Sequence, residues 1–267
     1  MITESDVTAD PGTRRLAARL LQQSAAFDRL SRSPRTASVV HRLRVLTRRM
    51  RAAGAVARWL APSKALRDLA RRLRRAGRAL GERRTLDVAA ADYAALSGGR
   101  TYPAIETARA AAETKLTRRL RSRHREAVID AVRAAAESLR ATATEPGALE
   151  RFLRSRTEGL RERLGAVTKK ELHALRIEAK KTRYAFETSR WMGREGTRNV
   201  ERALRNLQRR LGRIHDFEVL RALLPARDPI AIRAAARESA LRAGVRPIAV
   251  ALKSVPPFAR GGNGRFP

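Results

Sequence analysis

The sequence predicts an all-α protein whose two halves resemble each other. One stretch occurs twice: VHRLRVLTRRMRAA begins at Val40, and LHALRIEAKKTRYA begins at Leu172. Neither copy contains Gly or Pro, and both are rich in Ala, Leu, Arg and Lys, which favour helix. No part of the chain shows the alternation of apolar and polar residues that indicates a strand. We therefore expect helices throughout, with the two copies as equivalent helices.

Breaks in the apolar pattern divide the first half into helices. Ser and Thr around Pro34 are N-cap candidates, Pro62 and Ser63 turn the chain, and Gly81 is expected to end a helix as its C-cap. A flexible leader is expected at residues 1–12, before the first half at 13–143. The expected helices of this half span Arg14–Leu30, the first motif copy to Leu60, Lys64–Leu80, Leu86–Leu96, and Pro103–Ala143, where an internal break is allowed.

The segment ATATEPG at 141–147 is the expected boundary, because it combines Pro, Gly and Thr. The second half then runs over 148–252, with Thr168 as a candidate cap for the second motif helix. Residues 253–267 are expected to form a disordered tail. The expected helices of this half span Ala148–Leu164, the second motif copy to Met192, Thr197–Leu211, Asp216–Leu224 and Pro229–Ala243.

The charge of the chain indicates an anionic partner. Lys and Arg number 59 against 26 Asp and Glu, which gives a net charge of +33. Such a chain attracts polyanions, and the planar guanidinium of Arg binds phosphate oxygens through paired hydrogen bonds. The absence of Cys excludes disulfides and thiolate metal sites. No apolar signal segment or membrane-length apolar run occurs, so we expect a cytoplasmic protein.

The duplicated motif places the same cations on the same helical face. At about 100° per residue, one arc of roughly 80° collects the basic residues of each copy, opposite an apolar face that includes Leu43 and Met50. Arg49 and Lys181 lie about 80° from their His on the helical wheel, where they either flank the groove or face solvent. The basic residues on the two arcs are His41, Arg44, Arg48 and Arg51, and His173, Arg176, Lys180 and Arg183.

A second repeat follows the first. LRRAGRALGERRTLDVA, from Leu73, aligns with LRNLQRRLGRIHDFEVL, from Leu204. A single basic helix face is usually just solvated, but duplication at matched positions favours a binding site. The matched pairs are Arg74 with Arg205, Arg78 with Arg209, Gly81 with Gly212 and Arg84 with His215.

The pattern HxLRxxx[RK][RK]xR, followed by a basic helix that ends in LGxx[RH], occurs in both halves and resembles the CHAD family, the conserved histidine α-helical domain. The resemblance covers roughly residues 12–252. It implies two pseudo-symmetric bundles of about four helices each around a basic groove. It also implies binding of inorganic polyphosphate and association with polyphosphate granules.

Carried over onto this chain, the resemblance implies a set of polyphosphate-binding residues. The family pattern LGxxRD is incomplete in both halves: Thr85 replaces the Asp in the first, and His215 replaces the Arg before Asp216 in the second. The implied set is His41, Arg44, Arg48, Arg49, Arg51, Arg74, Arg78, Arg84, His173, Arg176, Lys180, Lys181, Arg183, Arg205, Arg209 and His215.

The expected function is non-catalytic binding of inorganic polyphosphate, without cofactor, metal or membrane. Nonspecific nucleic-acid binding is one alternative, although aromatic residues make up only 4% of the chain and no zinc-finger spacing occurs. A histidine phosphotransfer module that uses His41 and His173 is another. A polyphosphate hydrolase or kinase is disfavoured, because the phosphate-binding loop GxxxxGK[ST] is absent.

Overall fold

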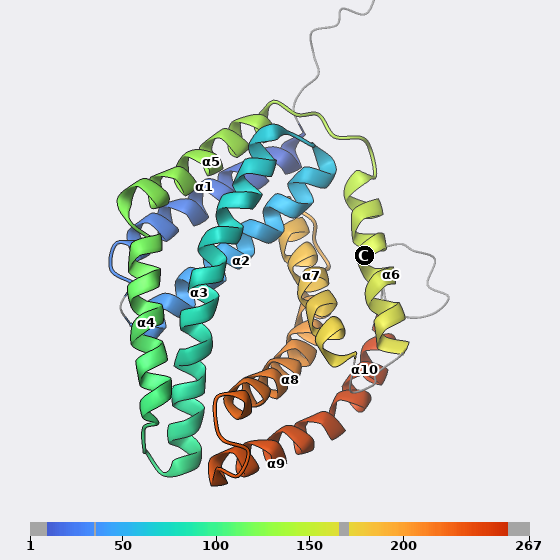
Figure 1. Ribbon diagram of the computed structural model, residues 1–267. Helices are drawn as coiled ribbons and strands as arrows, with labels where there is room; N and C mark the ends of the chain where they lie inside the picture. The colour runs from blue at the N-terminus through green and yellow to red at the C-terminus, as the bar shows by residue number, and fades with distance from the viewer. Residues whose placement is uncertain (1–9, 35, 166–170, 256–267) are drawn as a thin grey trace, which may run out of the picture.

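The computed structural model describes residues 10–34, 36–165 and 171–255, and every regular element within them is an α-helix (Figure 1). This confirms the predicted all-α class. The helices are α1 Pro11–Ser31, α2 Ala37–Leu60, α3 Lys64–Ser97, α4 Pro103–Arg119, α5 Ser122–Arg140, α6 Ala148–Gly165, α7 Leu172–Trp191, α8 Arg198–Ala222, α9 Pro229–Ala243 and α10 Val245–Lys253.

Side-chain caps set several helix starts. The hydroxyl of Thr36 accepts a hydrogen bond from the backbone N–H of Val39 (3.2 Å) and begins α2. Ser63 caps α3 in the same way through the N–H of Leu66 (3.3 Å). Each cap satisfies one of the N–H groups that the first turn of a helix leaves free. The breaks predicted before both helices are therefore confirmed.

Two predicted helix ends are wrong. Gly81 does not cap a helix, because α3 continues through it to Ser97 and ends at Gly98, whose φ of 74° is left-handed. In the second half, α8 likewise runs through Gly212 without a break. A single Gly costs a helix only about 1 kcal/mol relative to Ala, and the flanking Arg, Ala and Leu residues favour helix.

Other boundaries differ less. The long helix expected over Pro103–Ala143 is divided, and α5 begins after a break at Leu120 and Arg121. The first helix begins at Pro11, inside the expected leader, where Asp10 caps it. The short helix α10 was not predicted. Thr168, most of the leader and most of the tail lie outside the described residues.

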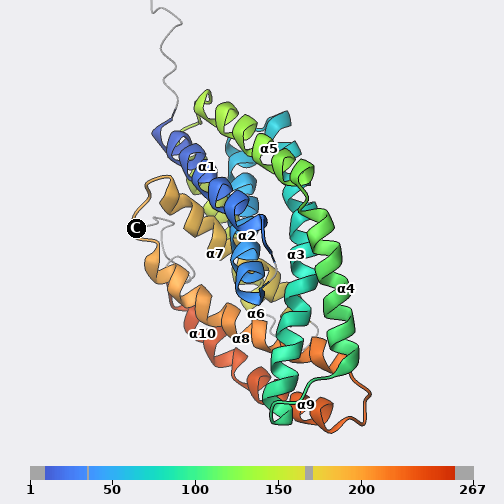
Figure 2. The ribbon, with the colours of Figure 1, turned by 90° about the vertical axis from the view of Figure 1, so that its left-hand side faces the viewer.

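Helices of one half pack mainly on one another, and the α2–α7 and α3–α8 pairs are the most extensive of several contacts that join the halves. In the first half, α1 packs on α2 and α5, and α3 packs on α2, α4 and α5. Figure 2 shows α3 and α4 side by side along the molecule. In the second half, α7 packs on α6 and α8, and α8 on α9 and α10. The contacts of α2 with α7 and of α3 with α8 connect the halves, so the duplicated helices meet at the centre (Figure 1).

One apolar core runs through both halves. It includes Leu43 and Met50 of α2, as the helical pattern predicts, together with Leu175 of α7 and Leu204 of α8. These side chains are at most 1% exposed, so the core holds α2, α3, α7 and α8 in fixed relative positions. The arrangement as two four-helix bundles stays a prediction.

A buried carboxylate ties the halves together beside this core. Glu187 of α7 is only 4% exposed at its side chain and receives a cation from each half. Its Oε1 lies 2.7 Å from Nε of Arg49 on α2, and its Oε2 lies 3.1 Å from Nη1 of Arg183 on α7. Arg183 also donates from Nε to Oε1 of Gln208 on α8 (2.8 Å). Glu187 and Arg183 together therefore connect α2, α7 and α8.

We expect Glu187→Gln to destabilise the protein by about 3–5 kcal/mol, because it leaves Arg183 buried without its counter-charge. Thermal denaturation monitored by circular dichroism measures this as a clear fall in Tm. Asp130→Asn is the matched control, since it removes an exposed ion pair with Arg133 and should cost less than about 1 kcal/mol. Equal effects of the two variants would contradict the role assigned to Glu187.

Candidate functional site

Cations from both halves gather where α2, α3 and α7 meet. The side chains are linked by mutual charge repulsion: Arg44 is affected by Arg48, Arg176 and Arg84, and Lys180 by Arg176, Arg48, Arg44 and Arg51. This group is called the central cationic cluster and consists of Arg44, Arg48, Arg51, Arg84, Arg176 and Lys180. The sequence analysis predicted all six as site residues, and the fold brings them together.

The cluster has almost no counter-charge. Within the described residues, the side chains of Arg44, Arg51 and Lys180 form no ion pair or hydrogen bond, and neither do those of Arg84 and Arg176. Nε of Arg176 is buried and donates to no described group. The nearby acids are Asp216, which interacts through charge with Arg176 and Arg84, and Glu218, which interacts with Arg176. Guanidinium groups without a partner in the protein are available to an anion from solution.

Burial and repulsion make the charged forms costly. Burial, with the charges of Arg48, Arg176 and Arg84, lowers the pKa of Arg44 to about 10. Burial, with the charges of Arg176, Arg48, Arg44 and Arg51, lowers the pKa of Lys180 to about 8. An anion bound here would offset both effects, since an opposite charge favours the protonated form.

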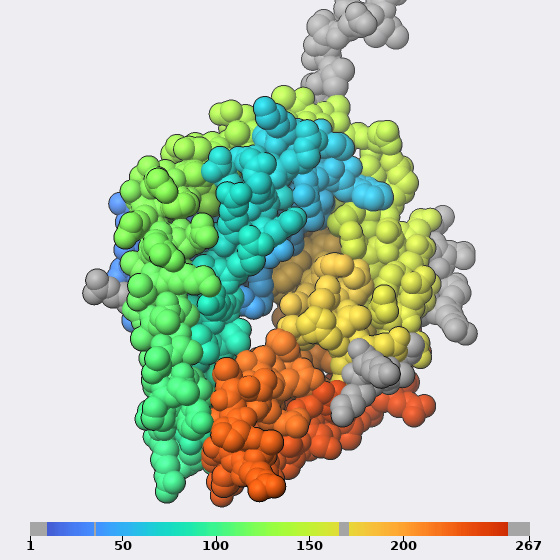
Figure 3. Space-filling view, in the orientation of Figure 1, coloured from blue at the N-terminus to red at the C-terminus, as the bar shows by residue number. Residues whose placement is uncertain are grey.

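In the view of Figure 3, the surface of the molecule is hollowed at its centre, between α2, α3, α7 and α8. Beside the cluster, α2, α3, α6 and α7 enclose a cavity of about 400 Å³, here called the α2–α6–α7 pocket. Arg48, Arg51 and Lys180 of the cluster line it. Arg48 is fixed there, because Nε and Nη2 both donate to the hydroxyl oxygen of Tyr184 (2.9 and 2.6 Å).

Gly81 makes room for the cluster. A Cβ at this position would lie only 2.6 Å from Nη1 of Arg44, closer than side-chain carbons approach other atoms. The lack of a side chain therefore lets the Arg44 guanidinium lie against α3. Gly212, the matched position in α8, has no heavy atom within 4 Å of such a Cβ. The glycine that the sequence suggested as a C-cap thus allows Arg44 to lie close to α3.

The histidines lie at one end of the cluster. Burial and the charges of Arg84, Arg48 and Arg44 lower the pKa of His41, which favours its neutral ring. His173 and His215 pack edge to face with ring centroids 6.0 Å apart, so two predicted histidines meet across α7 and α8. Burial and the charge of Arg176 lower the pKa of His215, although its hydrogen bond to Glu218 raises it.

The incomplete Arg–Asp patterns of the two repeats complement each other. Arg84 of the first half and Asp216 of the second interact through charge where α3 packs on α8. Burial nevertheless raises the pKa of Asp216, against the charges of Arg213, Arg176 and Arg84, while Asp92 adds to the rise. The first half keeps the Arg and the second keeps the Asp, so the site contains one of each.

Several predicted residues lie apart from the cluster. Arg183 and Arg49 both pair with the buried Glu187 and are not part of the central cationic cluster. The contacts of Arg205 and Arg209 stay on α8, with Glu201 (3.5 Å) and Asn206 (3.2 Å).

The remaining predicted cations lie around the cluster. Burial and the charges of Arg74 and Arg78 lower the pKa of Arg51, so these two arginines extend the cluster on α3. Lys181 lines the α2–α6–α7 pocket but pairs with Glu178 (3.0 Å). Sequence reasoning did not single out Tyr184, whose twin position in the repeat holds Ala52. That difference between the two copies is the signal that could have identified it.

Within the described residues, no helix is long and apolar enough to cross a membrane. A family model for the CHAD domain matches residues 15–225. The fold is similar to the crystal structure of the CHAD domain from the plant Ricinus communis, at 19% identity over 96% of this chain and 95% of that chain, with a TM-score of 0.72. It is also similar to PptA from Streptomyces chartreusis, at 18% identity over 90% and 96% of the two chains, with a TM-score of 0.53. No curated protein matches the chain.

We expect Lys180→Met to stabilise the protein by about 1–2 kcal/mol at pH 7, allowing for solvent screening. The folded-state pKa of about 8 lies below the ordinary 10.5, so the charged amine opposes folding below about pH 8. This cost fades as the pH rises toward 10.5, and the gain in Tm should therefore shrink at pH 10. Thermal melts at both pH values test this.

Lys181→Met is the control for this experiment, because Lys181 is exposed and paired with Glu178. It should give no gain at either pH. A gain from Lys180→Met that is the same at pH 7 and pH 10 would show that the charge of Lys180 is not what destabilises the fold.

Proposed function

Because the chain belongs to the CHAD domain family, we propose that it binds inorganic polyphosphate through the central cationic cluster and does not turn it over. One observation carries the proposal: unneutralised cations from both halves, Arg44 and Arg176 among them, converge on one site. Such a site suits a ligand that presents many negative charges in succession. A single phosphoryl group would neutralise only part of it.

The chemistry of the cluster supports a phosphate chain. Arginine forks donate paired hydrogen bonds to phosphate oxygens, and these charge-assisted bonds are about twice as strong as neutral ones. The guanidinium group of Arg48 is already held by Tyr184, and Gly81 leaves room for that of Arg44, so binding need not order Arg48 anew. Binding also releases the counterions of the polyanion, so affinity should fall steeply with salt.

The location of the cluster favours polyphosphate over nucleic acid. Arg44, Arg48 and Arg176 are each partly buried rather than spread over a convex surface. A single flexible phosphate chain can follow a recessed site, whereas a duplex presents its phosphates on a stiff, wide rod. The same binding would bring the protein to polyphosphate granules in the cytoplasm, and this location is part of the proposal.

Binding without turnover fits the groups at the site. Catalysis of phosphoryl transfer relies on metal-holding carboxylates or on an activated nucleophile in addition to cations. Near the cluster, Asp92 accepts two hydrogen bonds from Arg213 (3.0 and 2.9 Å). Glu187 is likewise engaged by Arg49 and Arg183. Asp216 and Glu218, the acids that act on Arg176, lie 3.6 Å from Arg213 and 2.5 Å from Arg242. These acids all have basic partners in the scaffold, and the cations do the binding.

We expect Arg44→Ala/Arg176→Ala to lower the affinity for long-chain polyphosphate about tenfold or more, because two charge-assisted contacts are lost. The measurement is displacement of labelled polyphosphate by unlabelled polyphosphate or duplex DNA, at matched phosphate concentration and several salt concentrations. The native protein should prefer polyphosphate, and the variant should lose that preference.

Arg205→Ala/Arg209→Ala is the matched control. It removes the same charge from the same chain, at positions whose contacts stay on α8. It should reduce the affinity only slightly. If the control loses as much affinity, or if DNA competes as well as polyphosphate, binding is diffuse and the proposed site is rejected.

We expect Gly81→Ala to separate stability from binding. Alanine should stabilise α3 by about 0.5–1 kcal/mol, since Gly is the poorer helix former. Its Cβ would displace the guanidinium of Arg44, so affinity for polyphosphate should fall several-fold. Gly212→Ala should give a similar gain in Tm with unchanged binding, because its Cβ meets no heavy atom within 4 Å. Equal affinity of both variants for polyphosphate would show that the space at Gly81 does not matter for binding.

A further inference from the structure

The α2–α6–α7 pocket has a wall that a bare phosphate chain does not need. On one side it presents Arg48, Arg51 and Lys180 of the central cationic cluster. The rest of its lining includes small or apolar side chains from four helices, namely Ala52, Ala55, Val56, Ala70, Phe152 and Ala185. An anion of phosphate alone gains nothing from this carbon surface. A ligand that uses the whole pocket carries a flat apolar group next to its phosphates.

The pocket has the volume and the lining residues for such a group. Its volume of about 400 Å³ falls in the range of small-molecule sites, and the alanines leave that space open. The Phe152 ring lies at the back of the wall and is only 4% exposed, with the half-exposed Trp59 packed against it at a ring-centroid distance of 5.6 Å. Arg156 lies over the Phe152 ring at 5.2 Å. Aromatic rings and guanidinium planes are the surfaces on which nucleobases stack.

Polar groups stand at the junction between the two walls. The hydroxyl oxygen of Tyr184 accepts from Arg48, which leaves its O–H proton to donate to a ligand in the pocket. The side chains of Arg51 and Lys180 have no ion-pair partner among the described residues. By contrast, Lys181 and Arg156 share Glu178. Arg58 and Arg74 also line the pocket, and neither has an ion-pair partner among the described residues. The pocket therefore offers free cations on both sides of its apolar lining.

We propose that the α2–α6–α7 pocket binds a nucleoside polyphosphate, with the base against the Arg156 guanidinium and the alanine wall and the phosphates on Arg48, Arg51 and Lys180. This inference rests on the proposed function, because the same cations take the phosphates. It adds a ligand class, since the apolar wall distinguishes a nucleotide from inorganic polyphosphate. The two ligands compete for Arg48, Arg51 and Lys180.

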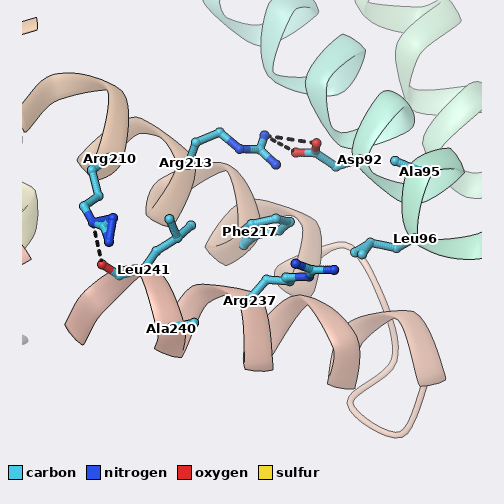
Figure 4. Close-up of a pocket in the computed structure, with 9 residues that line it drawn as sticks. All are labelled: Asp92, Ala95, Leu96, Arg210, Arg213, Phe217, Arg237, Ala240 and Leu241. Atoms are coloured by element: carbon cyan, nitrogen blue, oxygen red, sulfur yellow. Dashed lines mark hydrogen bonds and ion pairs between the residues drawn. The ribbon is translucent and has the colours of Figure 1, made fainter. Parts of the chain in front are cut away.

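A second cavity, of about 560 Å³ between α3, α8 and α9, is less suited to this role (Figure 4). Arg213 is held by Asp92, and Nε of Arg210 donates to the carbonyl oxygen of Leu241 (3.1 Å). Two of its three arginines are thus occupied by the protein. This cavity provides a control position, because Ala240 lines it as Ala55 lines the α2–α6–α7 pocket.

The experiment is isothermal titration of the full chain with ATP and with inorganic tripolyphosphate, in magnesium-free buffer. Both ligands carry three phosphates in a row, so the ratio of their affinities isolates the contribution of the nucleoside. We expect ATP to bind about tenfold more tightly, because stacking of one base is worth that much or more. Ala55→Leu should fill the apolar wall and bring the ratio to about one, with tripolyphosphate binding retained.

Ala240→Leu should leave both affinities unchanged. ATP that binds no more tightly than tripolyphosphate would overturn the nucleotide assignment while leaving the proposed function in place. A nucleotide preference that survives Ala55→Leu would overturn the assignment to this pocket. If neither ligand nor long-chain polyphosphate binds, the proposed function itself is rejected, and the nucleotide proposal with it.

Discussion

Repulsion among the partly buried cations of α2, α3 and α7 is the constraint on which this structure depends. Arg44, Arg176 and Lys180 each carry a lowered pKa because burial and like charges oppose the protonated form. The apolar core shared by both halves, with side chains such as Leu43 and Leu175 fully or almost fully buried, opposes that repulsion. Glu187 adds an ion pair to each half at the same interface. The folded chain thus keeps these cations close together against their mutual repulsion.

Much of the fold could be predicted from the sequence, because helix propensity and apolar spacing are local properties. The duplicated motif predicted that His41 and Arg44 occupy one face of their helix, and that the matched residues of the second copy occupy the same face of theirs. The contact between α2 and α7 brings Arg44 and Arg176 together. Local patterns failed where a neighbour decides the outcome. Gly81 resembled a helix end, yet its role is to admit Arg44. Arg183 matched the basic arc, yet a buried acid captures it.

The two copies of the motif have diverged in ways that shape the site. Tyr184 stands where the first copy has Ala52, and its hydroxyl oxygen holds Arg48 of the opposite half. Ala52 leaves open the space that became part of the α2–α6–α7 pocket. A twofold-symmetric molecule would have two identical pockets or two identical tyrosines at its centre. Instead, the two residues line one pocket, where Tyr184 anchors Arg48 and Ala52 leaves space, and no pattern shared by the two copies could reveal this difference.

The charge interaction between Arg84 and Asp216 has a consequence for how the chain can be altered. Each repeat has kept one member of the pair, so the site takes the Arg from one half and the Asp from the other. The relative orientation of the halves is then as much a determinant of the site as its residues. A change in the length of the connector at 141–147 that rotated one half could abolish recognition without replacing a single ligand-facing side chain.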